Sequence, residues 1–96
     1  MHRLAPFPRH SVNERRRARR FPYPALVRVD EFVGTGIDIS TCGLAVHLPA
    51  PLPIGQRVTV TLGGGFGRPD EISTTARVVR CPRNGTGFIV GLEFNA

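Results

Sequence analysis

A chain of 96 residues forms one small domain, which excludes a two-domain enzyme with a separate substrate lobe. All 13 basic residues are arginine, and seven of them lie in residues 1–20 against a single acid, Glu14. Residues 21–96 hold six arginines and six acids, so this part is neutral. The sequence predicts a neutral domain with a cationic N-terminal arm, and such an arm favours an anionic partner.

Several classes of protein are disfavoured by what the chain lacks. Its longest apolar stretches span about five residues, whereas a membrane span needs roughly 20. The N-terminus has no apolar signal region, so a cytoplasmic location is expected. Cys42 and Cys81 stand apart from each other, and the histidines share no ligand spacing, so we expect reduced thiols and neither a metal nor a cofactor. No catalytic triad or carboxylate pair can be assembled, which predicts a protein that is not an enzyme.

Strands are favoured by the composition, because 22 residues are Val, Ile or Thr. Taken in chain order, the apolar patterns predict strands over residues 25–29, 32–39, 44–48, 58–62, 72–80 and 88–94. Proline-rich residues 49–55 and glycine-rich residues 63–70 are expected to be loops, and residues 1–14 a flexible tail. Short strands with one apolar face each hide their edges in a closed barrel or a tight sandwich, so we expect an all-β domain.

The strongest local feature is the arginine cluster of residues 15–20, which contains Arg15, Arg16, Arg17, Arg19 and Arg20. A guanidinium group is a planar fork that grips phosphate in bidentate fashion, stacks on a base and pairs with a guanine edge. A solvated basic tail explains the cluster equally well. The cluster alone therefore does not decide between a ligand-binding arm and a tail.

The segment from Asp38 to Gly43 follows the second expected strand and allows two interpretations. In the structural one, Asp38 and Ser40 cap a turn through side-chain to backbone hydrogen bonds, and Gly43 supplies a positive φ. In the functional one, the Asp38 carboxylate accepts from the N1–H and N2–H edge of guanine, Ser40 meets phosphate or base, and Gly43 lets the ligand approach the backbone. Alternation places Asp38 and Ser40 on one side of the strand and Ile39 on the other.

In this order the motifs resemble those of the PilZ domain family. RxxxR precedes the first strand, DxSxxG separates the second and third strands, and residues 90–94 (VGLEF) end the last one. The resemblance covers residues 14–95 and implies a small six-stranded antiparallel β-barrel with a flexible basic arm, residues 15–96 forming the domain. It also implies a receptor for the bacterial second messenger cyclic di-GMP that acts on an unidentified downstream protein.

Carried over residue by residue, the resemblance assigns ligand binding to six positions, which are Arg15, Arg16, Arg20, Asp38, Ser40 and Gly43. Arg16 and Arg20 are preferred for RxxxR because Phe21 and Pro22 then follow the second arginine. Arg15 and Arg19 satisfy the same spacing, so Arg19 is a further candidate. As the additional arginine before RxxxR, Arg15 is associated in the family with an intercalated ligand dimer.

Arg80, at the end of the fifth expected strand, is another candidate for the same site, with a surface charge beside a turn as its other interpretation. Two functions remain as alternatives. One is a PilZ-like protein adaptor that does not bind nucleotide. The other is a small nucleic-acid-binding β-barrel, which the scarcity of exposed aromatic residues disfavours, because single strands stack on such residues.

Overall fold

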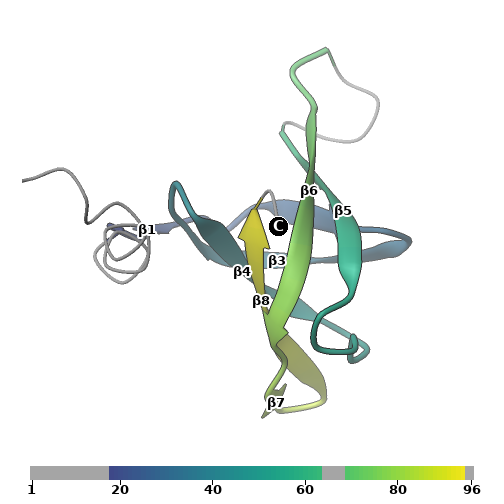
Figure 1. Ribbon diagram of the computed structural model, residues 1–96. Helices are drawn as coiled ribbons and strands as arrows, with labels where there is room; N and C mark the ends of the chain where they lie inside the picture. Colours follow the sequence, from purple (N-terminus) through teal and green to yellow (C-terminus); the bar gives the residue numbers. More distant parts are fainter. Residues whose placement is uncertain (1–17, 64–68, 95–96) are drawn as a thin grey trace, which may run out of the picture.

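The computed structural model of the chain describes residues 18–63 and 69–94, and these residues form strands, turns and loops without a helix (Figure 1). The strands are β1 (Phe21–Pro22), β2 (Leu26–Val29), β3 (Phe32–Ile39), β4 (Gly43–Leu48), β5 (Arg57–Leu62), β6 (Ile72–Arg80), β7 (Arg83–Asn84) and β8 (Gly87–Phe94). The six long strands begin and end within one residue of the bounds that the apolar patterns predict. The expected tail of residues 1–14 lies outside the described residues. No membrane-spanning helix occurs in the described part of the chain.

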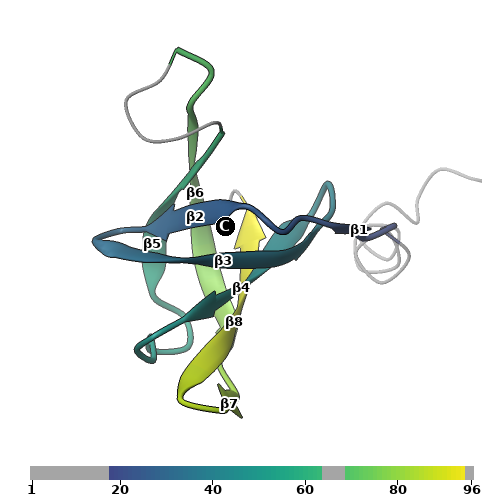
Figure 2. The same cartoon turned by 180° about the vertical axis from the view of Figure 1, so that it is seen from behind.

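Six long strands close into a barrel in which every pairing is antiparallel. Neighbouring strands follow the order β3, β2, β5, β6, β8 and β4, and β4 pairs in turn with β3. Figures 1 and 2 show the barrel from opposite sides, with β6 and β8 in one wall and β2 and β3 in the other. The expected six-stranded antiparallel barrel is therefore confirmed.

Two strands of two residues each were not expected from the sequence. β1 pairs with the end of β3, and β7 pairs with the start of β8. Two residues are too few to show the alternation by which a strand is recognised. β1 positions Arg19 and Arg20, which directly precede it, because it extends beyond the barrel beside the turn between β3 and β4 (Figure 1).

The core is built from the inward faces of the long strands, as their alternating patterns predict. Its fully buried side chains are mostly valine and leucine, among them Val27, Val29, Leu44, Val46, Leu48, Val60, Val78 and Val90. Leu52, from the proline-rich loop, also packs into this core. Ile72 lies on the same face of β6 as the buried Ala76 and Val78 but is 61% exposed, so this face of β6 extends past the end of the core.

A β-bulge interrupts the alternation in each of two strands. Between β3 and β4, Gly36 pairs with Val46 and Asp38 with Ala45, so Ile37 is the extra residue. In a regular strand Asp38 would face inward like Gly36, and Ile39 would face outward. The extra residue reverses this alternation, so that Ile39 packs against the core and Asp38 faces outward.

The second bulge has the same effect in β6. Val78 pairs with Leu92 and Arg80 with Gly91, which leaves Val79 as the extra residue. Cys81 then packs against the core, while Arg80 is exposed. Both bulges therefore turn a charged side chain outward near the end of a strand.

Gly43 is required by close packing between strands. A Cβ atom at this position would lie 2.0 Å from the backbone oxygen of Leu92 on β8. The expectation that Gly43 supplies a positive φ is wrong, since the glycines with positive φ in the described part of the chain are Gly55, Gly63 and Gly85. Contact between β4 and β8 explains this glycine, and the turn before it closes without a left-handed residue.

Truncation of a core leucine tests the importance of the barrel interior. Replacing Leu48, which is fully buried, by Ala leaves a cavity and should lower the free energy of unfolding by about 2–5 kcal/mol. The control Leu26→Ala, at a position that is 58% exposed, should change it by less than about 0.5 kcal/mol. Urea denaturation followed by circular dichroism measures both, and equal effects would contradict this placement of the core.

Candidate ligand-binding site

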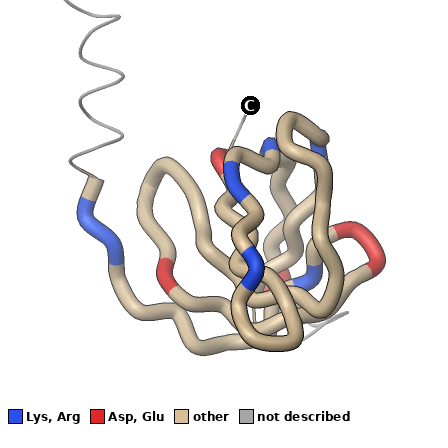
Figure 3. Tube along the Cα trace, turned by 90° about the horizontal axis from the view of Figure 1, so that it is seen from below, with Lys and Arg blue, Asp and Glu red and all other residues tan. Residues whose placement is uncertain are grey.

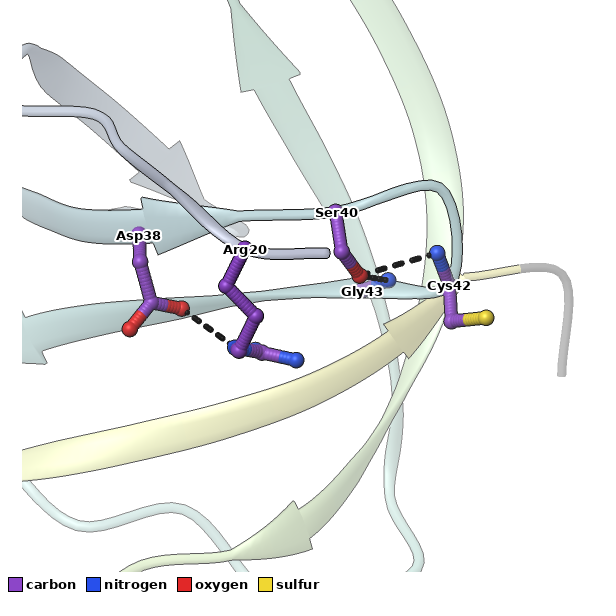
Figure 4. Close-up of polar contacts among 5 residues, drawn as sticks. All are labelled: Arg20, Asp38, Ser40, Cys42 and Gly43. Carbon is purple, nitrogen blue, oxygen red and sulfur yellow. Dashed lines mark hydrogen bonds and ion pairs between the residues drawn. The ribbon is translucent and has the colours of Figure 1, made fainter. Parts of the chain in front are cut away.

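Pairing of β1 with β3 brings Arg20 beside Asp38. Phe21 pairs with Ile39 and Pro22 with Asp38, so the chain just before β1 runs past the outward-facing carboxylate. Arg20 Nε donates a hydrogen bond of 2.8 Å to Asp38 Oδ1, and Figure 4 shows the two side chains pointing toward each other. Residues 18 positions apart in the sequence therefore form one ion pair.

The ion pair leaves binding groups available on both side chains. Arg20 uses Nε, so its two terminal nitrogens can donate elsewhere, and Asp38 keeps its second oxygen. The side chains are 41% and 31% exposed, and a pair this exposed contributes only about 0–1 kcal/mol to stability. A ligand can therefore rearrange the pair at little cost to the fold.

Ser40 organises the turn between β3 and β4. Its Oγ accepts hydrogen bonds from the backbone N–H groups of Cys42 and Gly43, at 3.0 and 3.2 Å, and its own N–H donates to the Gly43 carbonyl at 2.9 Å. Figure 4 shows the hydroxyl directed at this turn. Ser40 thus has the turn-capping contacts of the structural interpretation, while its hydroxyl hydrogen can still be donated to a ligand.

A surface pocket of about 160 Å³ joins several of the candidate residues. Its lining comes from the segment before β1, the turn before β4, the end of β6 and the end of β8, and consists of Arg20, Cys42, Gly43, Val79, Arg80, Gly91, Leu92 and Glu93. Arg20, Gly43 and Arg80 therefore share one pocket. Asp38 is connected to it through Arg20.

Arg80 lies across a glycine at the edge of this pocket. A Cβ atom on Gly91 would lie 3.1 Å from Arg80 Nε and 3.3 Å from its Cγ. The bulge at Val79 sets Arg80 opposite Gly91, and the missing side chain leaves room for the arginine along the β8 backbone. The sequence offers no signal for this arrangement, because the bulge depends on how β6 pairs with β8.

The remaining arginine candidates differ in their surroundings. Arg19 lies over the ring of Phe21, with its Cζ 5.5 Å from the ring centroid, so its guanidinium is directed to an aromatic face. Arg15 and Arg16 lie outside the described residues. Five pocket residues were not among the sequence candidates, and these are Cys42, Val79, Gly91, Leu92 and Glu93.

Other kinds of site find less support. Cys42 and Cys81 are free thiols. Within residues 18–63 and 69–94, no three His, Cys, Asp or Glu side chains lie close enough together to hold a metal ion. The pocket instead combines guanidinium groups with a nearby carboxylate, which suits a ligand that carries both phosphate and hydrogen-bonding base edges.

Comparison with protein families is consistent with a site for a phosphate-containing ligand. The model of the PilZ domain matches residues 14–96. A comparison with curated protein sequences gives no match. PilZ domains generally bind cyclic di-GMP, and the family is one of binding and receptor domains. Because the match covers most of its length, the chain belongs to the PilZ domain family.

Proposed function

We propose that this domain is a receptor for cyclic di-GMP that has no catalytic activity and acts in the bacterial cytoplasm. The observation that carries the proposal is the ion pair between Arg20 and Asp38 at the edge of a pocket that also contains Arg80. A cyclic dinucleotide offers phosphates to the arginines and guanine edges to the carboxylate. The family match makes cyclic di-GMP the ligand to expect.

Within this proposal each side chain has a distinct role. Arg20 binds phosphate or guanine through its terminal nitrogens while Asp38 orients it, and the second oxygen of Asp38 accepts from a guanine edge. Ser40 holds the turn and donates its hydroxyl hydrogen. Gly43 lines the pocket, and we assign to it the approach of the ligand to the backbone.

The pocket is too small to enclose the ligand. Sites that bury a drug-sized molecule measure roughly 300–1,000 Å³, whereas this pocket measures about 160 Å³. Most of a cyclic dinucleotide would therefore lie on the outer face, where further residues must cover it. We assign this role to Arg15 and Arg16, and we propose that the ligand orders residues 1–20 over the barrel and so changes the surface offered to a partner.

The choice between the two RxxxR frames is supported by the contacts of their second arginines. Arg20 contacts Asp38, whereas Arg19 lies over Phe21. These contacts favour the frame of Arg16 and Arg20. Arg15 then stands as the additional arginine before RxxxR, and we propose that it serves an intercalated pair of ligand molecules.

Both alternative functions predict different binding. An adaptor that does not bind nucleotide would not respond to cyclic di-GMP, and the presence of both binding motifs argues against it. A nucleic-acid module would prefer an oligonucleotide and would depend strongly on salt. Phe21, which is 52% exposed, is the one aromatic side chain among the exposed large hydrophobic residues of the described part of the chain, and one ring provides a small stacking surface.

Truncation of either member of the ion pair tests the site. Arg20→Ala and Asp38→Ala should each weaken binding of cyclic di-GMP by about 1.5–3 kcal/mol, or roughly 10- to 150-fold, because each removes charge-assisted hydrogen bonds. Isothermal titration at about 0.15 M salt measures the change under conditions that screen nonspecific attraction.

Arg83→Ala is the matched control, because it removes an exposed arginine whose guanidinium lies over Phe88 outside the site. GMP and a short single-stranded DNA control for ligand class. Unchanged affinity in both site variants would contradict the site assignment, and a preference for the DNA would favour the nucleic-acid module.

The stoichiometry of binding tests the role of Arg15. We expect two cyclic di-GMP molecules per chain in the unmodified protein and one in Arg15→Ala, because the second molecule loses a guanidinium partner. Titration calorimetry gives both values directly. A stoichiometry of one in the unmodified protein would contradict the proposed ligand dimer and leave the other site residues unaffected.

A double-mutant cycle tests whether Gly91 acts through Arg80. Gly91→Ala should weaken ligand binding, because its Cβ would displace the Arg80 side chain that lies 3.1 Å away. In an Arg80→Ala background the same substitution should have little further effect. Additive losses of affinity would show that Gly91 does not position Arg80.

A further inference from the structure

The outer face of the β5–β6 hairpin carries two arginines directly opposite each other. Arg57 and Arg77 are register partners and both are exposed. In such pairs the Cβ atoms are about 4.5–5.5 Å apart, and like charges in this arrangement are destabilising. Among the described residues, neither arginine forms an ion pair or a side-chain hydrogen bond.

Next to these arginines the hairpin presents a polar surface. Thr59 pairs with Thr75, and both are exposed. Beyond them, the hydroxyl groups of Thr61 and Ser73 lie 3.1 Å apart and hydrogen-bond each other. The two guanidinium groups therefore project from a sheet face on which the neighbouring side chains of β5 and β6 are hydroxyl-bearing and uncharged.

Charged groups of both signs flank the two arginines. Arg28 on β2 is the register partner of Thr61, and Asp30 Oδ1 accepts a hydrogen bond of 2.8 Å from the Thr59 N–H. On the other side of Arg77, its register partner on β8 is Glu93. Figure 3 shows basic and acidic positions interspersed over the barrel. A nucleic-acid backbone or an anionic membrane needs a wider basic surface, whereas a carboxylate placed between two guanidinium groups needs only this pair.

We propose that the face formed by Arg57 and Arg77 binds an acidic segment of a partner protein. One carboxylate lies between the two guanidinium groups, accepts hydrogen bonds from both and removes their repulsion. Hydroxyl groups of Thr59 and Thr75 are available to the neighbouring peptide groups. Relief of the repulsion between the two arginines thus contributes to the free energy of binding the partner.

This face is connected to the candidate ligand site by strand pairing. Arg57, Arg77, Glu93 and Gly43 form one row across β5, β6, β8 and β4, and Glu93 and Gly43 line the pocket. The inference rests on the proposed function in one respect, namely that the partner would respond to the ligand. Binding of an acidic segment can be measured without ligand.

The stability of the unbound protein gives a first test. Arg57→Glu replaces a like-charge pair by an opposite-charge pair and should raise the unfolding midpoint by about 1–6 °C. Arg83→Glu, which changes the charge by the same amount on β7, should not. A midpoint for Arg57→Glu that is equal to or below that of the unmodified protein would overturn the claim that the two arginines repel each other.

A binding measurement gives the second test. The probe is a fluorescein-labelled ten-residue peptide of alternating Glu and Val, followed by anisotropy at about 0.15 M salt. The unmodified protein should bind it, and the double variant Arg57→Gln/Arg77→Gln should bind at least tenfold more weakly. Arg83→Gln is the control for the loss of one positive charge and should retain binding.

Three further arms decide the class of partner. The alternating Lys and Val peptide should not bind. The proposed partner would be overturned if a single-stranded oligonucleotide, or vesicles with 30% phosphatidylserine, bound more tightly than the acidic peptide and lost this binding in the double variant. Equal losses of peptide binding in the double variant and in Arg83→Gln would also overturn it. Titration with cyclic di-GMP separates the two proposals, because the double variant should bind the nucleotide within about twofold of the unmodified protein.

Discussion

Antiparallel pairing between β3 and β4 closes the ring of strands, and the candidate site depends on this pairing. β3 is hydrogen-bonded to β2 and β4 in the barrel and to β1 beyond it. Closure pairs the backbone N–H and C=O groups that the edge strands of an open sheet would expose. It also fixes the turn of residues 40–42, and β1 places Arg20 near this turn.

Both bulges connect this closure to the site. The side chains of a regular strand point alternately into the core and into solvent, so a charged residue at an inward-facing position would be buried. The extra residues Ile37 and Val79 shift the alternation by one position, and they turn Asp38 and Arg80 outward. Bulges are common beside functional sites because they redirect a side chain while leaving the rest of the strand paired.

Structural and functional roles overlap at several of these positions. Ser40 caps the turn, and Gly43 allows β4 to approach the Leu92 carbonyl. Loss of ligand binding on substitution of Ser40 or Gly43 would therefore not distinguish a direct contact from a displaced turn. Arg20 and Asp38 are different, because their exposed ion pair contributes little to stability.

The alternating apolar residues of the sequence determined the six long strands and the inward faces that form the core, because successive side chains of a strand point to opposite faces and apolar residues therefore recur at every second position. The order of RxxxR and DxSxxG also identified Arg20 and Asp38 as candidates before their contact was known. The bulges, the pairing of β1, the position of Arg80 over Gly91 and the opposition of Arg57 and Arg77 were decided only by the tertiary structure. Each depends on the register between strands that are distant in the sequence, and register is set by closure of the barrel.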